Sequence, residues 1–310
     1  HIESLYKSHN KYNIHVIEPQ NVQIIKLKKI LSIYKKKNNI FFYKKILKFD
    51  FDLDFVIIST NANVRRKIFT NLIKSNTFKN ILFEKIVFSS LKDYRNTQKE
   101  INRRKINAFV NFPRRSFKVY KYIKKKLIKT KNINYSLIGK NWGFATNTLH
   151  NIDLFSYLTN NSELKVNTFN IDKIRKSKKR KGFIEFNGLI IIKNDRDDIL
   201  ILQDFKSSKD TNLLNGGIKI ENSQFSFLIY ENRSKMYEIN NKNFFIKEIE
   251  IKLPKQSELT DKFIQKYKRK NISDLPTLDE CYHIHFLYIN SLSKQLVKIN
   301  NKYKNKIPIT

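Results

Sequence analysis

The chain has 310 residues, of which 40% are hydrophobic, and this is enough to bury a substantial core in one or two domains. Its single cysteine, Cys281, excludes an intramolecular disulfide and fits a reducing compartment, so we expect a cytoplasmic protein. There is no run of about 18 apolar residues, and the opening sequence HIESLYKSHN is not that of a signal peptide. We therefore expect no membrane partner.

The formal net charge of +35 raises the question of nucleic-acid binding, because Lys and Arg neutralise phosphates. However, abundant Lys, Asn and Ile with few Gly and Pro is the bias that an AT-rich genome produces at neutral surface positions. Most Phe and Tyr lie inside apolar runs, such as residues 40–43, and form no interleaved stacking platform. We do not expect nucleic acid to be the main partner, although a contiguous basic face would favour it.

The first 130 residues alternate short apolar runs with longer amphipathic ones. The predicted strands are residues 12–17, 54–59, 80–83 and 107–112, and the predicted helices are residues 21–36, 63–75, 89–105 and 117–129. Ser90 and Asp93 can serve the first turn of the third helix. This alternation predicts parallel pairing with right-handed crossovers, so we expect a Rossmann-type doubly wound sheet over residues 1–130.

The pattern changes over residues 131–310. A strand at 133–142 and a helix at 147–159 are followed by predicted strands at 164–169, 182–193, 199–205, 217–221, 224–230, 235–239 and 244–251. Turn signals at 194–195, 215–217 and 240–241 separate them. Two helices, 258–270 and 277–300, close the chain, and the Lys-rich residues 173–181 are predicted to be a solvated loop. We expect an α+β domain, with a mostly antiparallel sheet and helices on one face.

Short motifs occur along the chain in a recognisable order. They are Ile-Glu-Pro at 17–19, Ser-Thr-Asn at 59–61, Phe-Glu-Lys-Ile at 83–86, Val-Asn-Phe-Pro-Arg-Arg at 110–115, Gly-Phe-Ala-Thr-Asn-Thr-Leu-His-Asn-Ile-Asp at 143–153 and Leu-Pro-Thr-Leu-Asp-Glu at 275–280. In this order and spacing the sequence resembles the glucose–fructose oxidoreductase and inositol dehydrogenase family (Gfo/Idh/MocA). Members linked to bacterial surface-sugar biosynthesis look most similar, and the resemblance covers nearly the whole chain.

The resemblance implies an NAD(P)-dependent oxidoreductase that moves hydride between nicotinamide and a carbon of a sugar or nucleotide sugar, in surface polysaccharide biosynthesis. In that family the N-terminal domain binds NAD or NADP. The C-terminal sheet domain shapes the sugar site and often mediates oligomerisation, so a homo-oligomer is expected.

The family's first strand and glycine-rich phosphate loop are missing, because no glycine precedes Gly139. Either the chain is an N-terminally truncated fragment or the protein has lost this site. We expect a fragment, since the central strand of a doubly wound sheet is hard to delete. The strands at 12–17 and 54–59 should then flank the position of the missing strand.

Two residues match the family's catalytic motifs. Its Glu-Lys-Pro motif matches Glu84–Lys85, with Ile86 in place of proline, and its Asp-x-x-x-His motif matches Thr146 and His150, with threonine in place of aspartate. The resemblance implies that Lys85 lies near the nicotinamide and the reacting hydroxyl, and that His150 is the acid–base group. The chemistry agrees, because a histidine of ordinary pKa about 6.5 can exchange the hydroxyl proton and an ammonium stabilises developing negative charge.

The resemblance also implies cofactor contacts at strand ends, where open α/β sheets bind ligands. Glu18 matches the acidic residue that meets the adenosine ribose, which would favour NAD, but it could equally be an ordinary turn glutamate before Pro19. The resemblance implies that Ser59, Thr60 and Asn61 border the cofactor. It also implies that Glu84 contacts the cofactor.

Substrate contacts are expected from Arg114, Arg115, Trp142, Asn147 and Asp153. The two arginines match an arginine-containing segment that faces the site. The others have structural alternatives: Trp142 as a core residue, Asn147 as a helix cap, and Asp153 as a residue that orients a helix or His150, from which it is three positions away.

Three other interpretations stay open. Cys281, His283 and His285 could suggest a metal, but no second cluster supplies further ligands, and we expect none. The changes at Ile86 and Thr146 suggest a non-catalytic relative that binds a sugar or a partner. The charge alone suggests a nucleic-acid-binding protein. The dehydrogenase interpretation requires Lys85 and His150 to converge on one cleft.

Overall fold

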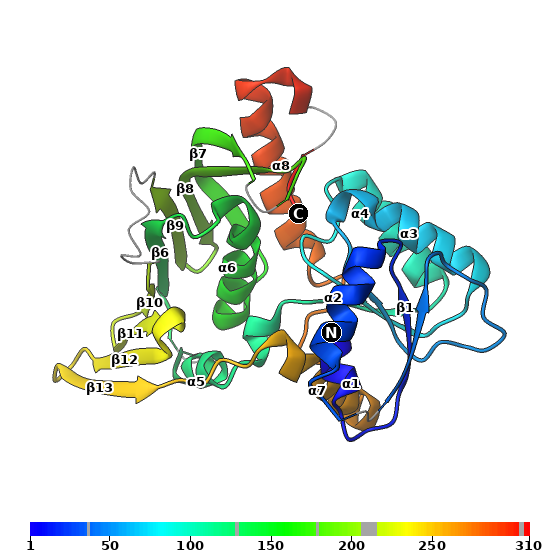
Figure 1. The fold of residues 1–310 in the computed structure, drawn as a ribbon. Helices are drawn as coiled ribbons and strands as arrows, with labels where there is room; N and C mark the ends of the chain where they lie inside the picture. The colour runs from blue at the N-terminus through cyan, green and yellow to red at the C-terminus, as the bar shows by residue number, and fades with distance from the viewer. Residues whose placement is uncertain (36–37, 128–129, 178–179, 206–215, 304–306) are drawn as a thin grey trace.

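A computed structural model describes residues 1–35, 38–127, 130–177, 180–205, 216–303 and 307–310 (Figure 1). Its strands form a two-stranded sheet, a three-stranded sheet and an eight-stranded sheet. The first two are parallel and the third is mostly antiparallel, so the predicted fold class is confirmed.

The parallel strands follow the predicted order along the chain. β1 (Asn13–Ile17) pairs with β2 (Asn39–Tyr43), and β3 (Val56–Ile58) pairs with β4 (Asn80–Phe83), which pairs with β5 (Asn107–Val110). The strand β2 was not predicted, because its apolar run was assigned only to the core. In the described chain, β1 and β3 belong to separate sheets.

Helices join these strands and pack on them. They are α1 (Ile2–Tyr6), α2 (Asn21–Leu31), α3 (Ala62–Ser75) and α4 (Leu91–Arg103), followed by α5 (Lys118–Leu127). The predicted helix at 21–36 is too long, since α2 ends at Leu31. Ser90 caps α4, as expected, by accepting a hydrogen bond from the Asp93 amide at 3.4 Å.

The eight-stranded sheet holds β6 (Asn134–Lys140), β7 (Leu164–Lys176), β8 (Ile184–Asn194), β9 (Ile199–Phe205), β10 (Ile218–Glu221), β11 (Phe225–Tyr230), β12 (Lys235–Asn240) and β13 (Phe245–Glu250). Their order is β13-β12-β11-β10-β6-β9-β8-β7, and the β6–β9 pair is parallel. The predicted loop at 173–181 is wrong over 173–176, because these residues continue the ladder of β7 with β8. Residues 178, 179 and 215, which fall in the predicted loop and turn, lie outside the described residues.

Two helices, α6 (Phe144–Thr159) and α8 (Tyr282–Ile299), lie on the side of this sheet that is turned toward the parallel strands (Figure 1). The predicted start of α6 at Asn147 is wrong. The helix begins at Phe144, because Gly143 takes φ +80° just before it. The start of α8 also differs, since Thr277 forms a β-bridge with Phe109 and residues 278–281 form turns before the helix. None of the described helices is long and apolar enough to cross a membrane.

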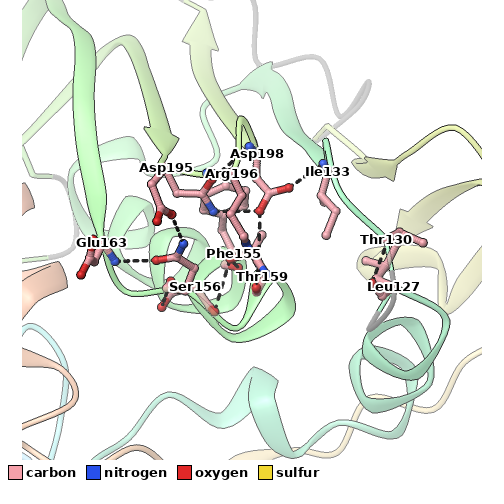
Figure 2. A network of polar contacts seen from close by, with 12 residues as sticks. Leu127, Thr130, Ile133, Phe155, Ser156, Thr159, Glu163, Asp195, Arg196 and Asp198 are labelled. Carbon is pink, nitrogen blue, oxygen red and sulfur yellow. Dashed lines mark hydrogen bonds and ion pairs between the residues drawn. The ribbon is translucent and has the colours of Figure 1, made fainter.

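A polar network anchors the far end of α6 (Figure 2). Asp198, in the turn between β8 and β9, accepts a hydrogen bond from the Ile133 amide at 2.8 Å, and Arg196 donates to the carbonyl of Thr159. Ser156 donates to the Asn161 carbonyl at 2.8 Å. The network therefore joins the last turn of α6 to the turn between β8 and β9.

The helix α7 (Gln256–Lys270) comes from the last third of the chain but packs on the parallel strands. Its Phe263 and Ile264 share a buried cluster with Leu82 and Phe109. Asp261 of α7 also accepts a hydrogen bond from Tyr12 at 2.6 Å. The division into a domain of residues 1–130 and a domain of residues 131–310 remains a prediction.

Candidate active site

Lys85 lies immediately beyond the carboxyl end of β4 and reaches across to α6. Its Nζ donates a hydrogen bond to the carbonyl of Thr146 at 2.8 Å. Burial lowers the pKa of Lys85 to about 8, Arg180 and Arg114 act in the same direction, and Glu84 and Glu185 oppose them. At pH 7 the side chain is therefore a cation whose proton is held less tightly than that of a surface lysine.

The turn that carries Lys85 is held by Arg65 of α3, a side chain only 1% exposed. Its guanidinium donates to the carbonyls of Glu84 at 2.7 Å and Val87 at 2.6 Å, and also to those of Ile86 and Thr60. The Lys85–Ile86 peptide bond is cis. Arg65 was missed by sequence reasoning, because nothing separates it from the other basic residues except its position on the buried face of a helix.

His285 supports the same turn from α8. Its Nε2 accepts a hydrogen bond from the Val87 amide at 3.3 Å, while Nδ1 donates to the carbonyl of Cys281 at 2.9 Å. Burial lowers the pKa of His285 to about 4, so the ring is neutral. Cys281 is fully buried. Within the described residues no group of three or more His, Cys, Asp or Glu side chains could hold a metal ion.

His150 lies one helical turn after Thr146, on the same face of α6. Burial holds its pKa well below the usual value, and the charges of Lys85 and Arg114 lower it further. Its Nδ1 is buried and has no hydrogen-bond partner among the described residues. Lys85 contacts α6 one turn before His150, and its charge acts on the imidazole, so a cation lies near a neutral histidine.

Asp153 does not bond to His150. It is fully buried and accepts three hydrogen bonds from Arg115, at 2.6 to 3.0 Å. Asp153 raises the pKa of Arg115 against the effect of burial, so the pair is ionised. This arrangement ties the segment after β5 to α6.

Arg114 is paired in a similar way. Its Nε and Nη2 donate to the two carboxylate oxygens of Glu231 at 3.0 and 2.6 Å, and Nη1 donates to Asn151 at 3.3 Å. Tyr120 donates to the same carboxylate at 2.6 Å. Although both arginines lie near the site, their guanidinium groups are engaged by protein carboxylates.

Trp142 and Asn147 shape the turn before α6. Trp142 Nε1 donates to the carbonyl of Gln203 at 2.9 Å, and Asn147 Nδ2 donates to the carbonyl of Trp142 at 2.6 Å. The cap interpretation of Asn147 is wrong, since this residue lies inside the helix and bonds backward to the turn.

The residues expected at the cofactor all lie at the carboxyl ends of parallel strands. Glu18, one residue past β1, accepts a hydrogen bond from the Gln20 amide at 2.9 Å. Ser59, Thr60 and Asn61 are exposed between β3 and α3. Glu84 accepts hydrogen bonds from His1 at 2.8 Å and Asn111 at 2.7 Å.

These strand ends carry polar and charged groups of several kinds. They offer a carboxylate at Glu18, exposed hydroxyl and amide groups at residues 59–61, and a cation at Lys85. Thr310 also reaches this edge, where its hydroxyl accepts a hydrogen bond from the Ala62 amide at 2.9 Å. Sequence reasoning missed Thr310, Glu185 and Arg180, which come from segments distant in the chain.

No protein-family model and no curated protein sequence matches the chain. Solved structures do. An oxidoreductase from Agrobacterium radiobacter in complex with NAD+, L-tartaric acid and magnesium superposes with a TM-score of 0.67 at 12% identity, covering 93% of this chain and 89% of that one. A levoglucosan dehydrogenase in complex with NADH and levoglucosan gives 0.68 at 13% identity, covering 92% and 88%.

A super-repressor mutant of Gal80p from Saccharomyces cerevisiae gives a TM-score of 0.67 at 14% identity, covering 92% of this chain and 87% of that one. The chain shares the fold of these proteins along nearly its whole length. At such low identity the likeness establishes the arrangement of the sheets and helices, which is the arrangement expected for the Gfo/Idh/MocA family.

Proposed function

We propose that the protein is an NAD(P)-dependent oxidoreductase that transfers hydride between nicotinamide and a carbon of a sugar or nucleotide sugar. The observation that carries this proposal is the hydrogen bond from Lys85, which follows β4, to the carbonyl of Thr146 in the first turn of α6. His150 lies on the same helix, one turn later. A surface polysaccharide or cell-envelope precursor is the proposed product class, which rests on the sequence motifs.

The site's own residues supply the proton chemistry. The neutral imidazole of His150 can accept the proton of a substrate hydroxyl, and the ammonium of Lys85 can stabilise the negative charge that develops on that oxygen. A bound nicotinamide would supply the hydride acceptor or donor. Arg65 and His285 hold the Lys85 turn, so the ammonium keeps its place between the strand end and α6.

The proposed cofactor contacts are Glu18, Ser59, Thr60, Asn61 and Glu84, all at the strand-end edge. Glu18 would accept hydrogen bonds from ribose hydroxyls and would repel a 2′-phosphate, so NAD is favoured over NADP.

Substrate contacts are proposed from the carboxyl-terminal sheet side. Trp142 lies in the turn before α6, and Asn147 follows Thr146, the residue that receives Lys85, in the helix. Arg114, Arg115 and Asp153 complete the set, although each is paired with another protein side chain. Because these side chains are paired with one another or with Glu231, we propose that they shape the wall of the site, and that Lys85 and His150 carry out the proton transfer.

Calorimetry of the intact protein with NADH and NADPH tests the cofactor. Turnover is then followed at 340 nm with UDP-N-acetylglucosamine as the first nucleotide-sugar probe, followed by other nucleotide sugars. We expect Lys85→Ala and His150→Ala each to lower turnover by about 100-fold or more and to leave the dissociation constant for NADH within about threefold. The absence of any nicotinamide binding would remove the proposal.

A non-catalytic relative is the second candidate. The hydroxyl of Thr146 stands where the motif has a carboxylate, and it donates at 3.2 Å to the Gly143 carbonyl, so His150 receives no carboxylate from this position. The fold is also that of a Gal80p repressor mutant. NADH binding without hydride transfer to any nucleotide sugar, together with a sugar or protein partner, would favour this candidate.

We also propose that the protein is a homo-oligomer that associates through the eight-stranded sheet. The face opposite α6 carries aliphatic side chains at Ile138, which is 45% exposed, and at the partly exposed Ile191 and Ile201. Apolar sheet faces of this kind commonly cover one another in oligomers. Light scattering should show a dimer or a larger assembly that Ile201→Lys dissociates, whereas a monomer at micromolar concentration would exclude the assembly.

A further inference from the structure

Glu185, a partly buried residue near the start of β8, contacts the first turn of α6. Its Oε1 accepts a hydrogen bond from the Ala145 amide at 2.5 Å and from its own chain neighbour, the Phe186 amide, at 3.3 Å. A carboxylate at this place stabilises the positive end of the helix dipole. No motif singled out Glu185, so its role comes only from the structure.

The next carbonyls of the same turn are fixed by groups from other elements. Tyr288 of α8 donates to the Ala145 carbonyl at 2.8 Å, and Lys85 donates to the Thr146 carbonyl at 2.8 Å. Two consecutive residues of α6, Ala145 and Thr146, are therefore held by side chains from β8, from α8 and from the turn after β4. Any change in the position of this turn would move the acceptor of Lys85.

The second oxygen of Glu185 is not used in this way. Oε2 has no hydrogen-bond donor among the described residues. A Cβ placed on Gly143 would lie 3.8 Å from it. The carboxylate therefore keeps an unshared oxygen beside the turn that receives Lys85.

Besides burial, four charged residues act on the pKa of Lys85. Arg180 and Arg114 oppose its protonation, while Glu84 and Glu185 favour it. Glu84 already accepts hydrogen bonds from His1 and Asn111. Glu185 is itself influenced by Arg175 and Asp204, and its charge is felt by Tyr288 on α8.

We propose that Glu185 is a positioning residue of the Lys85–His150 site: it fixes the first turn of α6 with one carboxylate oxygen, and its negative charge adds to that of Glu84 in favouring the protonated form of Lys85. The role in catalysis rests on the proposed function, whereas the electrostatic effect of Glu185 on Lys85 does not. Burial raises the pKa of Glu185, which is consistent with a carboxylate taken partly out of water.

Competitive labelling with trace acetic anhydride between pH 6 and 11, read by peptide mass spectrometry, gives the titration midpoint of each lysine. In the parent chain we expect Lys85 to titrate near pH 8. Glu185→Gln keeps an oxygen for the Ala145 amide and removes only the charge, so the Lys85 midpoint should fall by about half a unit or more. The matched control is Glu163→Gln, an exposed carboxylate whose loss should leave the midpoint unchanged.

The reciprocal measurement keeps the test decisive if Glu185→Gln does not fold. Carboxyl-carbon NMR of Glu185 in Lys85→Met should show a higher midpoint than in the parent chain, by the same amount, because coupling between two sites is mutual. A Lys85 midpoint that does not move in a folded Glu185→Gln, or a Glu185 midpoint that does not move in Lys85→Met, would overturn the proposal. Neither experiment uses a nucleotide, so failure to bind NADH would remove the proposed function and leave the coupling between Glu185 and Lys85 standing.

Discussion

The Nζ of Lys85 donates to the carbonyl of Thr146 at 2.8 Å, across 61 positions of sequence. One partner follows a parallel strand and the other lies in the first turn of a helix on the antiparallel sheet, so this bond helps to join the two kinds of sheet at the candidate site. His150 follows on the same helix face, which places the imidazole and the ammonium on the same side of α6.

Replacing Lys85 with methionine should stabilise the fold at neutral pH. The pKa of Lys85 is about 8 in the folded chain and near its usual 10.5 when unfolded. Below pH 8 the folded state therefore bears the full cost of a buried cation, on the order of 3 kcal/mol, partly offset by the bond to Thr146. We expect Lys85→Met to raise the free energy of unfolding at pH 7 by about 1–3 kcal/mol.

The stability difference between the parent chain and Lys85→Met should change with pH in a defined direction. As pH rises from about 8 toward 10.5, the folded parent chain loses the proton that the unfolded chain keeps, so the parent gains stability relative to Lys85→Met. Urea unfolding at pH 7, 8.5 and 10 should show the advantage of the variant shrinking. An advantage that grows with pH would contradict the lowered pKa. A surface control, Lys262→Met, replaces an exposed lysine and should show no such trend.

The fold could be predicted largely because its signals are local. The apolar run at 80–83 becomes a parallel strand with Ile81, Leu82 and Phe83 buried, and the turn signals at 194–195 and 240–241 mark turns between antiparallel strands. The strand β2 and the extension of β7 to Lys176 were missed, because each pairs with a partner that local sequence does not reveal. In both cases the sequence pattern is ambiguous, and pairing with a neighbouring strand makes the segment a β-strand.

The site could be predicted only in part. Lys85 and His150 were identified from motif order, but their supports were not. Arg65 is indistinguishable in sequence from Arg66, and its importance comes from burial against four carbonyls of the Lys85 turn and the preceding loop. Glu185 reaches the site only because β8 lies beside α6. Such contacts depend on tertiary packing and leave no periodic signal.

Removing Arg65 should destabilise the protein strongly. Arg65→Met would leave the carbonyls of Glu84 and Val87, and those of Ile86 and Thr60, without their buried donor. Each unsatisfied buried carbonyl costs about 1–3 kcal/mol, so we expect a loss of at least about 3 kcal/mol in the free energy of unfolding. Urea denaturation measures this loss.

The neighbouring residue provides the control. Arg66 is partly exposed and donates a single hydrogen bond, at 3.1 Å, to Thr97. Arg66→Met should cost about 1 kcal/mol. Equal losses for the two variants would show that the four carbonyl bonds of Arg65 do not stabilise the Lys85 turn.

The Arg115–Asp153 pair should behave as a coupled unit. Asp153 is fully buried, so Asp153→Asn leaves a guanidinium without its charge partner, and Arg115→Met leaves a buried carboxylate alone. Each single change should cost about 3–5 kcal/mol, whereas the double variant should cost much less than their sum. Thermal unfolding of the four proteins forms the cycle. Additive losses would mean that the two side chains act independently.

Gly143 and Gly182 allow crowding at the start of α6 to be separated from backbone strain. Both take positive φ, +80° and +85°, so an alanine at either position adopts an unfavourable conformation that costs about 1 kcal/mol. A Cβ on Gly182 would meet nothing within 4 Å, whereas one on Gly143 would lie 2.9 Å from Asn147 Nδ2 and 3.2 Å from Thr146 Oγ1.

Gly143→Ala should therefore cost about 1–2 kcal/mol more than Gly182→Ala in the free energy of unfolding, because Asn147 and Thr146 must move. Since Thr146 also receives Lys85, the change should disturb the candidate site and shift the labelling midpoint of Lys85, which Gly182→Ala should leave in place. Urea denaturation and competitive labelling of both variants measure the two effects. Equal stability losses with an unmoved Lys85 would mean that the first turn of α6 tolerates displacement and does not determine the geometry of the site.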